Sequence, residues 1–147
     1  MADELFRLYQ GVVLDHNRSP RNYRVLDRAS HQGHGYNPLC GDRIDLMLEV
    51  VDGRIEHVAF QGDSCAIATA SASLLTEVIK GRRVSDAAEL IESFRQALDG
   101  DTASLPEQLE PLLAVRSFPS RIKCAQLPWA SLETALGNGD TATTDTR

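Results

Sequence analysis

The chain contains few cysteines, no long run of basic residues and no long run of apolar residues. Its three cysteines are an odd number, so they do not form a disulfide framework. A net charge of −6 without a basic run excludes the usual pattern of a nucleic-acid-binding protein. The N-terminal residues have neither a basic start nor an apolar stretch, so we expect no signal peptide, no membrane partner and a cytoplasmic location.

The cysteines are Cys40, Cys65 and Cys124, and none of them belongs to a Cys-x-x-Cys pair. In the cytoplasm they stay reduced, where a few cysteines near turn glycines are typical of metal binding or catalysis. A length of 147 residues without internal repeats predicts a single domain. We assign this domain to residues 1–137 and predict that the Gly-, Thr- and Asp-rich tail, 138–147, is disordered.

Helical periodicity of apolar residues predicts five helices. Cys65 lies at the N-terminus of the second, which Asp63 or Ser64 would cap. Pro128 either kinks the last helix or starts it, and both options leave an irregular backbone around Cys124. The five segments are residues 3–16, with His16 at the helix end, 65–80, 85–98, with Ser85 as cap, 107–115, and 121–136.

Residues 43–61 predict a β-hairpin, because apolar residues alternate on both sides of the turn dipeptide Asp52-Gly53. With this dipeptide as the loop, Val51 pairs with Arg54, and the register of the whole hairpin follows. The preceding residues, 17–36, show no clear period and predict a polar loop.

In this register Cys40 lies opposite Cys65, and Asp42 falls on the same apolar face. The three side chains then converge at the open end of the hairpin, at the edge of the core. His57 falls on that face in mid-strand, where we interpret it as a packed core residue. We interpret His34 as a solvated histidine of the polar loop.

The sequence Asn37-Pro38-Leu39-Cys40-Gly41-Asp42 separates a thiol from a carboxylate by one glycine. In an extended backbone, residues two positions apart point to the same side, so Cys40 and Asp42 would face one point in space. Gly41 would allow the chain to approach an ion closely. With Cys65 and Cys124, these residues supply three thiolates and one carboxylate.

Three thiolates and a carboxylate are enough for a four-coordinate zinc site, whose negative charge Arg121 and Lys123 are placed to offset. The same donors would also hold iron or a [2Fe–2S] cluster. The carboxylate of Asp42 is the harder ligand, so it is suited to leave zinc or to let a thiolate leave. A released Cys40 thiolate is a nucleophile for the terminal sulfur of a persulfide on another protein.

Three segments resemble the IscU-like iron–sulfur cluster assembly proteins, and most closely their SufU type, over residues 3–136. The resemblance implies an α+β fold, in which a small antiparallel sheet of about three strands is covered on one face by helices. It also implies a strand within residues 30–38. The segments are Asn37–Asp42, Gly62–Ala68 and Arg121–Trp129.

Three departures favour the SufU type over IscU proper. Lys123 stands where IscU carries a histidine before its third cysteine. Leu127-Pro128-Trp129 is not the Leu-Pro-Pro-Val-Lys stretch that a chaperone recognises. The spacing between Cys65 and Cys124 is longer than in IscU, and the excess maps to residues 100–120, where SufU-type proteins have an insertion.

The resemblance implies a zinc-dependent sulfurtransferase that accepts persulfide sulfur on Cys40 from a SufS-type, PLP-dependent cysteine desulfurase. Asp42, Cys65 and Cys124 are then the other zinc ligands, Arg121 helps docking, and further iron–sulfur assembly or acceptor proteins act downstream. One alternative is a scaffold on which a [2Fe–2S] cluster is assembled and transferred. Another is a purely structural zinc domain, which chelation would unfold.

Overall fold

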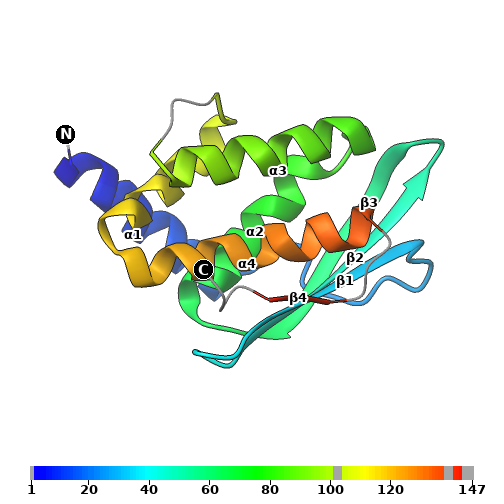
Figure 1. Cartoon of the computed structure of the whole chain (residues 1–147), viewed down its shortest axis with the longest axis horizontal. Helices are drawn as coiled ribbons and strands as arrows, with labels where there is room; N and C mark the ends of the chain where they lie inside the picture. Colours follow the sequence, from blue (N-terminus) through cyan, green and yellow to red (C-terminus); the bar gives the residue numbers. More distant parts are fainter. Residues whose placement is uncertain (1, 101–103, 138–140, 144–147) are drawn as a thin grey trace.

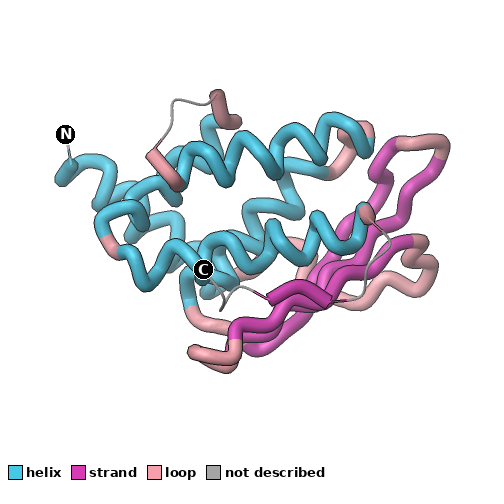
Figure 2. The backbone as a smooth tube through the Cα atoms, in the orientation of Figure 1, coloured by secondary structure: helices cyan, strands magenta, loops and turns pink. Residues whose placement is uncertain are grey.

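The computed structural model describes residues 2–100, 104–137 and 141–143. All helices lie to one side of a sheet, and α4 runs across that sheet (Figures 1 and 2). This arrangement confirms the predicted α+β fold with one face of the sheet covered. The elements are α1 (Ala2–Arg18), β1 (His31–Asn37), β2 (Asp42–Val51), β3 (Arg54–Asp63), α2 (Ala66–Ile79), α3 (Val84–Leu98), the 3₁₀ helix η1 (Glu107–Ser117), α4 (Pro119–Leu136) and β4 (Thr141–Thr143).

The sheet has the strand order β3-β2-β1-β4, and its first three strands are antiparallel. β1 confirms the strand implied within residues 30–38, so the polar-loop interpretation was wrong for that stretch. β4 pairs in parallel with β1 and lies within the segment predicted to be a disordered tail. The other residues of that segment, 138–140 and 144–147, lie outside the described residues. No described helix is both long and apolar enough to cross a membrane.

The β2–β3 hairpin turns at Asp52 and Gly53, as predicted, and both have positive φ angles, 51° and 79°. A β-bulge between Glu49 and Val50 then shifts the register by one residue, so that Glu49 pairs with His57. His57 is consequently exposed, with its ring nitrogen 3.8 Å from the Glu49 carboxylate, and the prediction of a packed core histidine was wrong.

Glycines on β1 let α4 approach the sheet closely. A Cβ atom at Gly33 would collide with the backbone carbonyl of Ser131, and one at Gly35 would collide with the Ser131 hydroxyl. The buried face of β1 is therefore formed by Gly33, Gly35 and Asn37 instead of by large apolar residues. This composition explains why apolar alternation did not reveal the strand.

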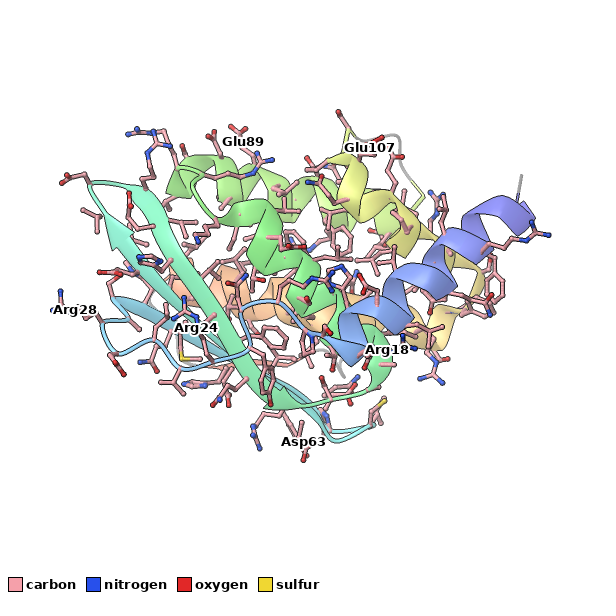
Figure 3. The ribbon with its side chains drawn as sticks, turned by 180° about the vertical axis from the view of Figure 1, so that it is seen from behind. Arg18, Arg24, Arg28, Asp63, Glu89 and Glu107 are labelled. Carbon is pink, nitrogen blue, oxygen red and sulfur yellow. The ribbon has the colours of Figure 1, made fainter. Side chains whose placement is uncertain are left out.

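The connection between α1 and β1 runs along the outer edge of β3. The backbone of Arg24 donates to the Phe60 carbonyl (3.1 Å), the Phe60 N–H donates to Asn22 (3.0 Å), and the Tyr23 ring packs edge-on against Phe60. Arg24 and Arg28, labelled in Figure 3, lie on this connection. The connection thereby covers an otherwise open sheet edge.

Hydrogen bonds fasten α1 and α4 to the central helix α2. His16 Nδ1 lies 2.7 Å from the Ser73 hydroxyl, and the Asn17 amide donates to the Ala66 carbonyl (2.6 Å). Ser71 donates to the Ala125 carbonyl (2.7 Å) and accepts from the Trp129 indole (3.1 Å). The prediction of Ser85 as the N-cap of α3 was wrong, because the helix begins at Val84 and its N-cap is Arg83.

Candidate metal centre

Cys40 lies in the four-residue loop that joins β1 to β2, and its side chain is exposed. The Asn37 carbonyl accepts from the N–H groups of Cys40 (3.2 Å) and Gly41 (2.7 Å), and Gly41 has a φ of +77°. The segment is thus a tight turn, and the prediction of an extended backbone at Cys40 and Asp42 was wrong. The turn still brings the Cys40 sulfur within 4.8 Å of a carboxylate oxygen of Asp42.

Asp42 is the first residue of β2, and only 5% of it is exposed. Its Oδ1 accepts from the Cys65 backbone N–H at 2.9 Å, which joins β2 to the start of α2. Its Oδ2 is buried and has no hydrogen-bond partner among the described residues. A buried carboxylate oxygen without a donor is costly unless a cation occupies the space beside it.

Cys65 is the N-cap of α2, and its sulfur accepts from the Ala68 N–H at 3.4 Å. The thiol itself, and not Asp63 or Ser64 as predicted, therefore caps the helix. A hydrogen bond from Cys124 lowers the pKa of the Cys65 thiol to about 7, although partial burial acts against the shift. This half-buried cysteine is therefore poised to be a thiolate near neutral pH.

Cys124 is fully buried within α4, which runs without interruption through Pro128. The predictions of a helix that starts at Pro128 and of irregular backbone around Cys124 were therefore wrong. Its hydrogen bond to Cys65, followed by burial, raises the pKa of the Cys124 thiol. The pKa values of the two cysteines therefore shift in opposite directions, with Cys124 as the hydrogen-bond donor and Cys65 as the acceptor.

The ligand atoms of Cys40, Asp42 and Cys124 lie within 4.8 Å of one another. Tetrahedral donors about 2.3 Å from a zinc ion lie about 3.8 Å apart, so small shifts would place all three on one ion. Cys65 is outside this group of three, but it contacts Asp42 through its N–H and Cys124 through its thiol. The predicted register, with Cys40 opposite Cys65, does not occur, because Arg43 pairs with Asp63.

The donor set fits a thiophilic metal or cluster. Three parts of the fold supply it: the β1–β2 hairpin, the start of α2 and the second turn of α4. The unpartnered Oδ2 of Asp42 and the adjoining sulfur atoms are the ligand types that zinc and iron–sulfur clusters accept. Figure 3 shows Asp63 at this end of the molecule, where β3 leads into α2.

A pocket of about 560 Å³ adjoins the centre, between the starts of α2 and α4 and one face of α1. Arg121 is exposed on the first turn of α4 and lines this pocket together with Cys65. Burial raises the pKa of Tyr9, and the nearby Arg121 acts in the opposite direction. Tyr9 also lines the pocket, and the other aromatic lining residues are Phe6 and Phe118.

Two other histidines contact polar groups other than the cysteine sulfur atoms. His34 lies on β1, where its Nδ1 is 2.9 Å from the Asp45 carboxylate. His16 is buried in the last turn of α1 and contacts Ser73. Lys123, by contrast, is half-buried and precedes Cys124 in α4.

The family described as NifU-like N terminal domain matches residues 8–138. The zinc-dependent sulfurtransferase SufU of Bacillus subtilis (strain 168) is 38% identical over 130 residues, which cover 86% of this chain and 87% of SufU. The iron–sulfur cluster assembly scaffold protein IscU of Streptococcus pyogenes serotype M1 is 35% identical over 136 residues, 90% of this chain and 85% of IscU.

Solved structures agree with these sequence relatives. A crystal structure of a putative iron–sulfur cluster assembly scaffold protein for the SUF system, from Fervidobacterium islandicum AW-1, superposes with a TM-score of 0.81 at 28% identity. The superposition covers 85% of this chain and 93% of the Fervidobacterium chain. The N-terminal part of a NifU-like protein from Brucella abortus shares the fold, with a TM-score of 0.82 at 16% identity over 93% and 96% of the two chains. The chain therefore belongs to the NifU-like N-terminal domain family of iron–sulfur cluster assembly proteins, of which SufU and IscU are members.

Proposed function

We propose that the chain is a zinc-dependent sulfurtransferase of iron–sulfur cluster assembly, which accepts persulfide sulfur on Cys40 from a SufS-type cysteine desulfurase. The observation that supports this function best is the asymmetry of the donors. Cys40 is exposed on a loop, whereas Asp42 and Cys124 are buried beside it. A sulfur-donating protein can therefore reach Cys40 while the other metal-ligating residues stay within the fold.

We assign Cys40, Asp42, Cys65 and Cys124 as the zinc ligands. Bound zinc would keep the thiols deprotonated at neutral pH. Cys65 and Cys124 lie on the helices α2 and α4, so their positions depend on the packed core. Asp42 is anchored through Oδ1, which leaves Oδ2 as the ligand atom.

The transfer step is a thiol–persulfide exchange. The Cys40 thiolate attacks the terminal sulfur of the donor's persulfide, a new S–S bond forms on Cys40, and the donor's own S–S bond breaks. The donor cysteine leaves with the electron pair as a thiolate, and the proton of the terminal sulfur moves with that sulfur. The exchange therefore needs no external oxidant or reductant.

We assign Arg121 a role in docking the donor protein. Its guanidinium group is exposed at the rim of the pocket that Cys65 lines, on the approach to the proposed centre. A planar guanidinium group can form paired hydrogen bonds with a carboxylate of the donor protein.

We also propose that residues 1–137 form one domain in which 100–120 are a SufU-type insertion. We propose further that the protein acts in the cytoplasm and passes sulfur on to downstream acceptors.

The decisive experiment adds the zinc-loaded protein to a SufS-type desulfurase with cysteine and then measures the intact mass of both proteins. We expect faster desulfurase turnover and one additional sulfur atom, located on Cys40 by peptide mapping. Cys40→Ala should abolish this uptake and retain the wild-type circular dichroism spectrum. Uptake that persists in Cys40→Ala, or no sulfur adduct on the wild type, would refute the proposal.

Assembly of a [2Fe–2S] cluster on the same residues is the second candidate function, favoured by the IscU scaffold relative that matches 90% of this chain. Its test is anaerobic reconstitution with iron and sulfide, followed by transfer to an apo-acceptor. A stable, transferable cluster that is lost in Cys124→Ala would support the scaffold function. A cluster that never forms, or forms and is not transferred, would argue against it.

A further inference from the structure

We propose that Asn37 is the residue that positions Cys40 in the metal centre, by closing the Pro38–Gly41 loop and by donating a hydrogen bond to the Cys40 sulfur. This inference rests on the proposed function, because it takes Cys40 as a metal ligand. Asn37 is the last residue of β1 and only 2% of it is exposed, which is rare for an asparagine next to a surface loop.

Three hydrogen bonds tie Asn37 to the loop. Its backbone carbonyl accepts from Cys40 (3.2 Å) and from Gly41 (2.7 Å). Its side-chain Oδ1 accepts from the backbone N–H of Leu39 (3.1 Å). The side-chain contact is an Asx turn, which sets the direction in which the chain leaves β1. Leu39 itself is 75% exposed, so the Leu39 side chain does not hold the loop in place.

The other half of the amide group points to the sulfur. Asn37 Nδ2 donates to Cys40 Sγ over 3.9 Å, a long contact even for sulfur. Asn37 also pairs directly with Asp42 across the two strands, so that their side chains lie on the same face of the sheet. The amide is therefore beside two members of the group formed by Cys40, Asp42 and Cys124.

Only an amide meets both requirements without adding charge. Oδ1 supplies the acceptor for the loop, and Nδ2 supplies the donor for the sulfur. A carboxylate at this position would be an acceptor only, beside the buried carboxylate of Asp42. Since Cys40 is the one exposed cysteine, the shape of its loop decides whether its sulfur meets the other donors.

The test measures zinc affinity of the full chain by competition with a chromophoric chelator, and counts bound thiolates from the thiolate-to-metal absorption of the cobalt(II) form. Asn37→Ala should weaken zinc binding by about 10- to 100-fold, as removal of outer-sphere partners does elsewhere. It should also lose the cobalt absorption contributed by one thiolate. Gln32→Ala, which removes an exposed amide from the same strand, is the matched control and should bind like the wild type.

A double-mutant cycle shows whether Asn37 acts through Cys40. In a Cys40→Ala background, Asn37→Ala should have no further effect on zinc affinity, because the residue that it positions is gone. Should Asn37→Ala fail to fold, the cycle is run with Asn37→Ser. The serine hydroxyl can accept the Leu39 N–H but is too short to reach Cys40 Sγ, so we expect a loss of several-fold that also vanishes in the Cys40→Ala background.

The outcomes separate this inference from the function on which it rests. Wild-type zinc affinity in the tested Asn37 variant, or an equal loss with and without Cys40, would overturn the role of Asn37 while the metal site stands. A wild-type protein that shows no thiolate-to-cobalt absorption would instead refute the proposed metal centre, and the inference would fall with it.

Discussion

Cys65 and Cys124 carry the same thiol group, but the pKa of Cys65 is lowered and the pKa of Cys124 is raised, because the two lie in different surroundings. Cys65 sits at the start of α2, where the Ala68 N–H stabilises a thiolate, whereas Cys124 is enclosed within α4. Their mutual hydrogen bond lowers the pKa of Cys65 and raises the pKa of Cys124. Of the two, Cys65 is therefore the cysteine that we expect to ionise first as the pH rises.

We predict that iodoacetamide alkylates Cys65 of the reduced, metal-free protein with a half-maximal rate near pH 7, since its pKa falls from 9.0 to about 7. The rate should rise as pH increases through this value, because the thiolate is the nucleophile. Peptide mapping at each pH gives the measurement. Cys124→Ala removes the largest cause of the shift and should move the midpoint upward. An unchanged midpoint in that variant would contradict the effect of Cys124 on the pKa of Cys65.

At the scale of the elements, the contact between β1 and α4 packs the strand that ends at Asn37 against the helix that carries Cys124. The close approach at Gly33 and Gly35 is possible only because neither residue has a Cβ atom. Since β1 carries the loop of Cys40 and α4 carries Cys124, this contact sets the distance between the two thiols.

We predict that Gly33→Ala destabilises the protein by about 1–3 kcal/mol, because the new methyl group meets the backbone of Ser131 and not a flexible side chain. Gly11→Ala is the matched control. Gly11 lies in α1 with nothing within 4 Å of the position of a Cβ atom, so alanine should stabilise the helix by about 0.5–1 kcal/mol. Urea unfolding measures both changes. Equal effects of the two substitutions would contradict the close packing.

The attachment of α1 to α2 should depend on pH through His16. Burial, and then the nearby Arg21, lower the pKa of His16 below its usual 6.5, while Glu77 and Asp15 act in the opposite direction. The unfolded chain therefore binds the proton more tightly, so the contribution of neutral His16 is present above pH 6.5 and is lost as the pH falls below it. The contact concerned is the hydrogen bond to Ser73.

We therefore expect the difference in unfolding free energy between the wild type and His16→Gln to be larger at pH 7.5 than at pH 5.5. Urea unfolding at both pH values measures this difference. His34→Gln is the control, because His34 lies half exposed on the sheet beside Asp45 and away from α1. A difference between wild type and His16→Gln that does not vary with pH would contradict the role of the neutral histidine.

At the scale of the whole molecule, the core is large enough to fold without metal. One cluster of buried side chains joins the sheet to all helices and includes the fully buried Phe60, Leu75, Phe94 and Leu132. The proposed ligands lie at one end of this cluster, so the metal site is an addition to the apolar core and not a replacement for it. A purely structural zinc domain would instead depend on the bound metal for its folding, because it would lack such an apolar core.

We predict that removal of zinc with a chelator lowers the melting temperature and leaves a cooperatively folded protein at 25 °C. At a free zinc concentration of about 100 times the dissociation constant, binding stabilises by about 2.7 kcal/mol. For a domain of this size that corresponds to about 5–10 °C. Differential scanning calorimetry with and without chelator gives the measurement. Loss of the cooperative transition on chelation would support the structural zinc domain instead.

Local sequence patterns were enough to predict the helices, the Asp52-Gly53 turn, the residues that bear thiols and carboxylates, and the family. These properties depend on local periodicity, on turn chemistry and on motifs within a few residues of each other. The helix that begins after Cys65 follows from the same local rules. The four proposed ligands were therefore identifiable as donors before their positions were known.

The place where these donors meet depends instead on contacts between distant parts of the chain. The bulge at Glu49 reversed the expected side of His57, and packing of α4 kept Pro128 within a continuous helix. The buried side of β1 is glycine and asparagine, which no apolar period reveals, and its partners lie about a hundred residues away in α4. Such contacts join residues distant in the chain, so their geometry follows from how the helices and the sheet pack together and not from any local pattern.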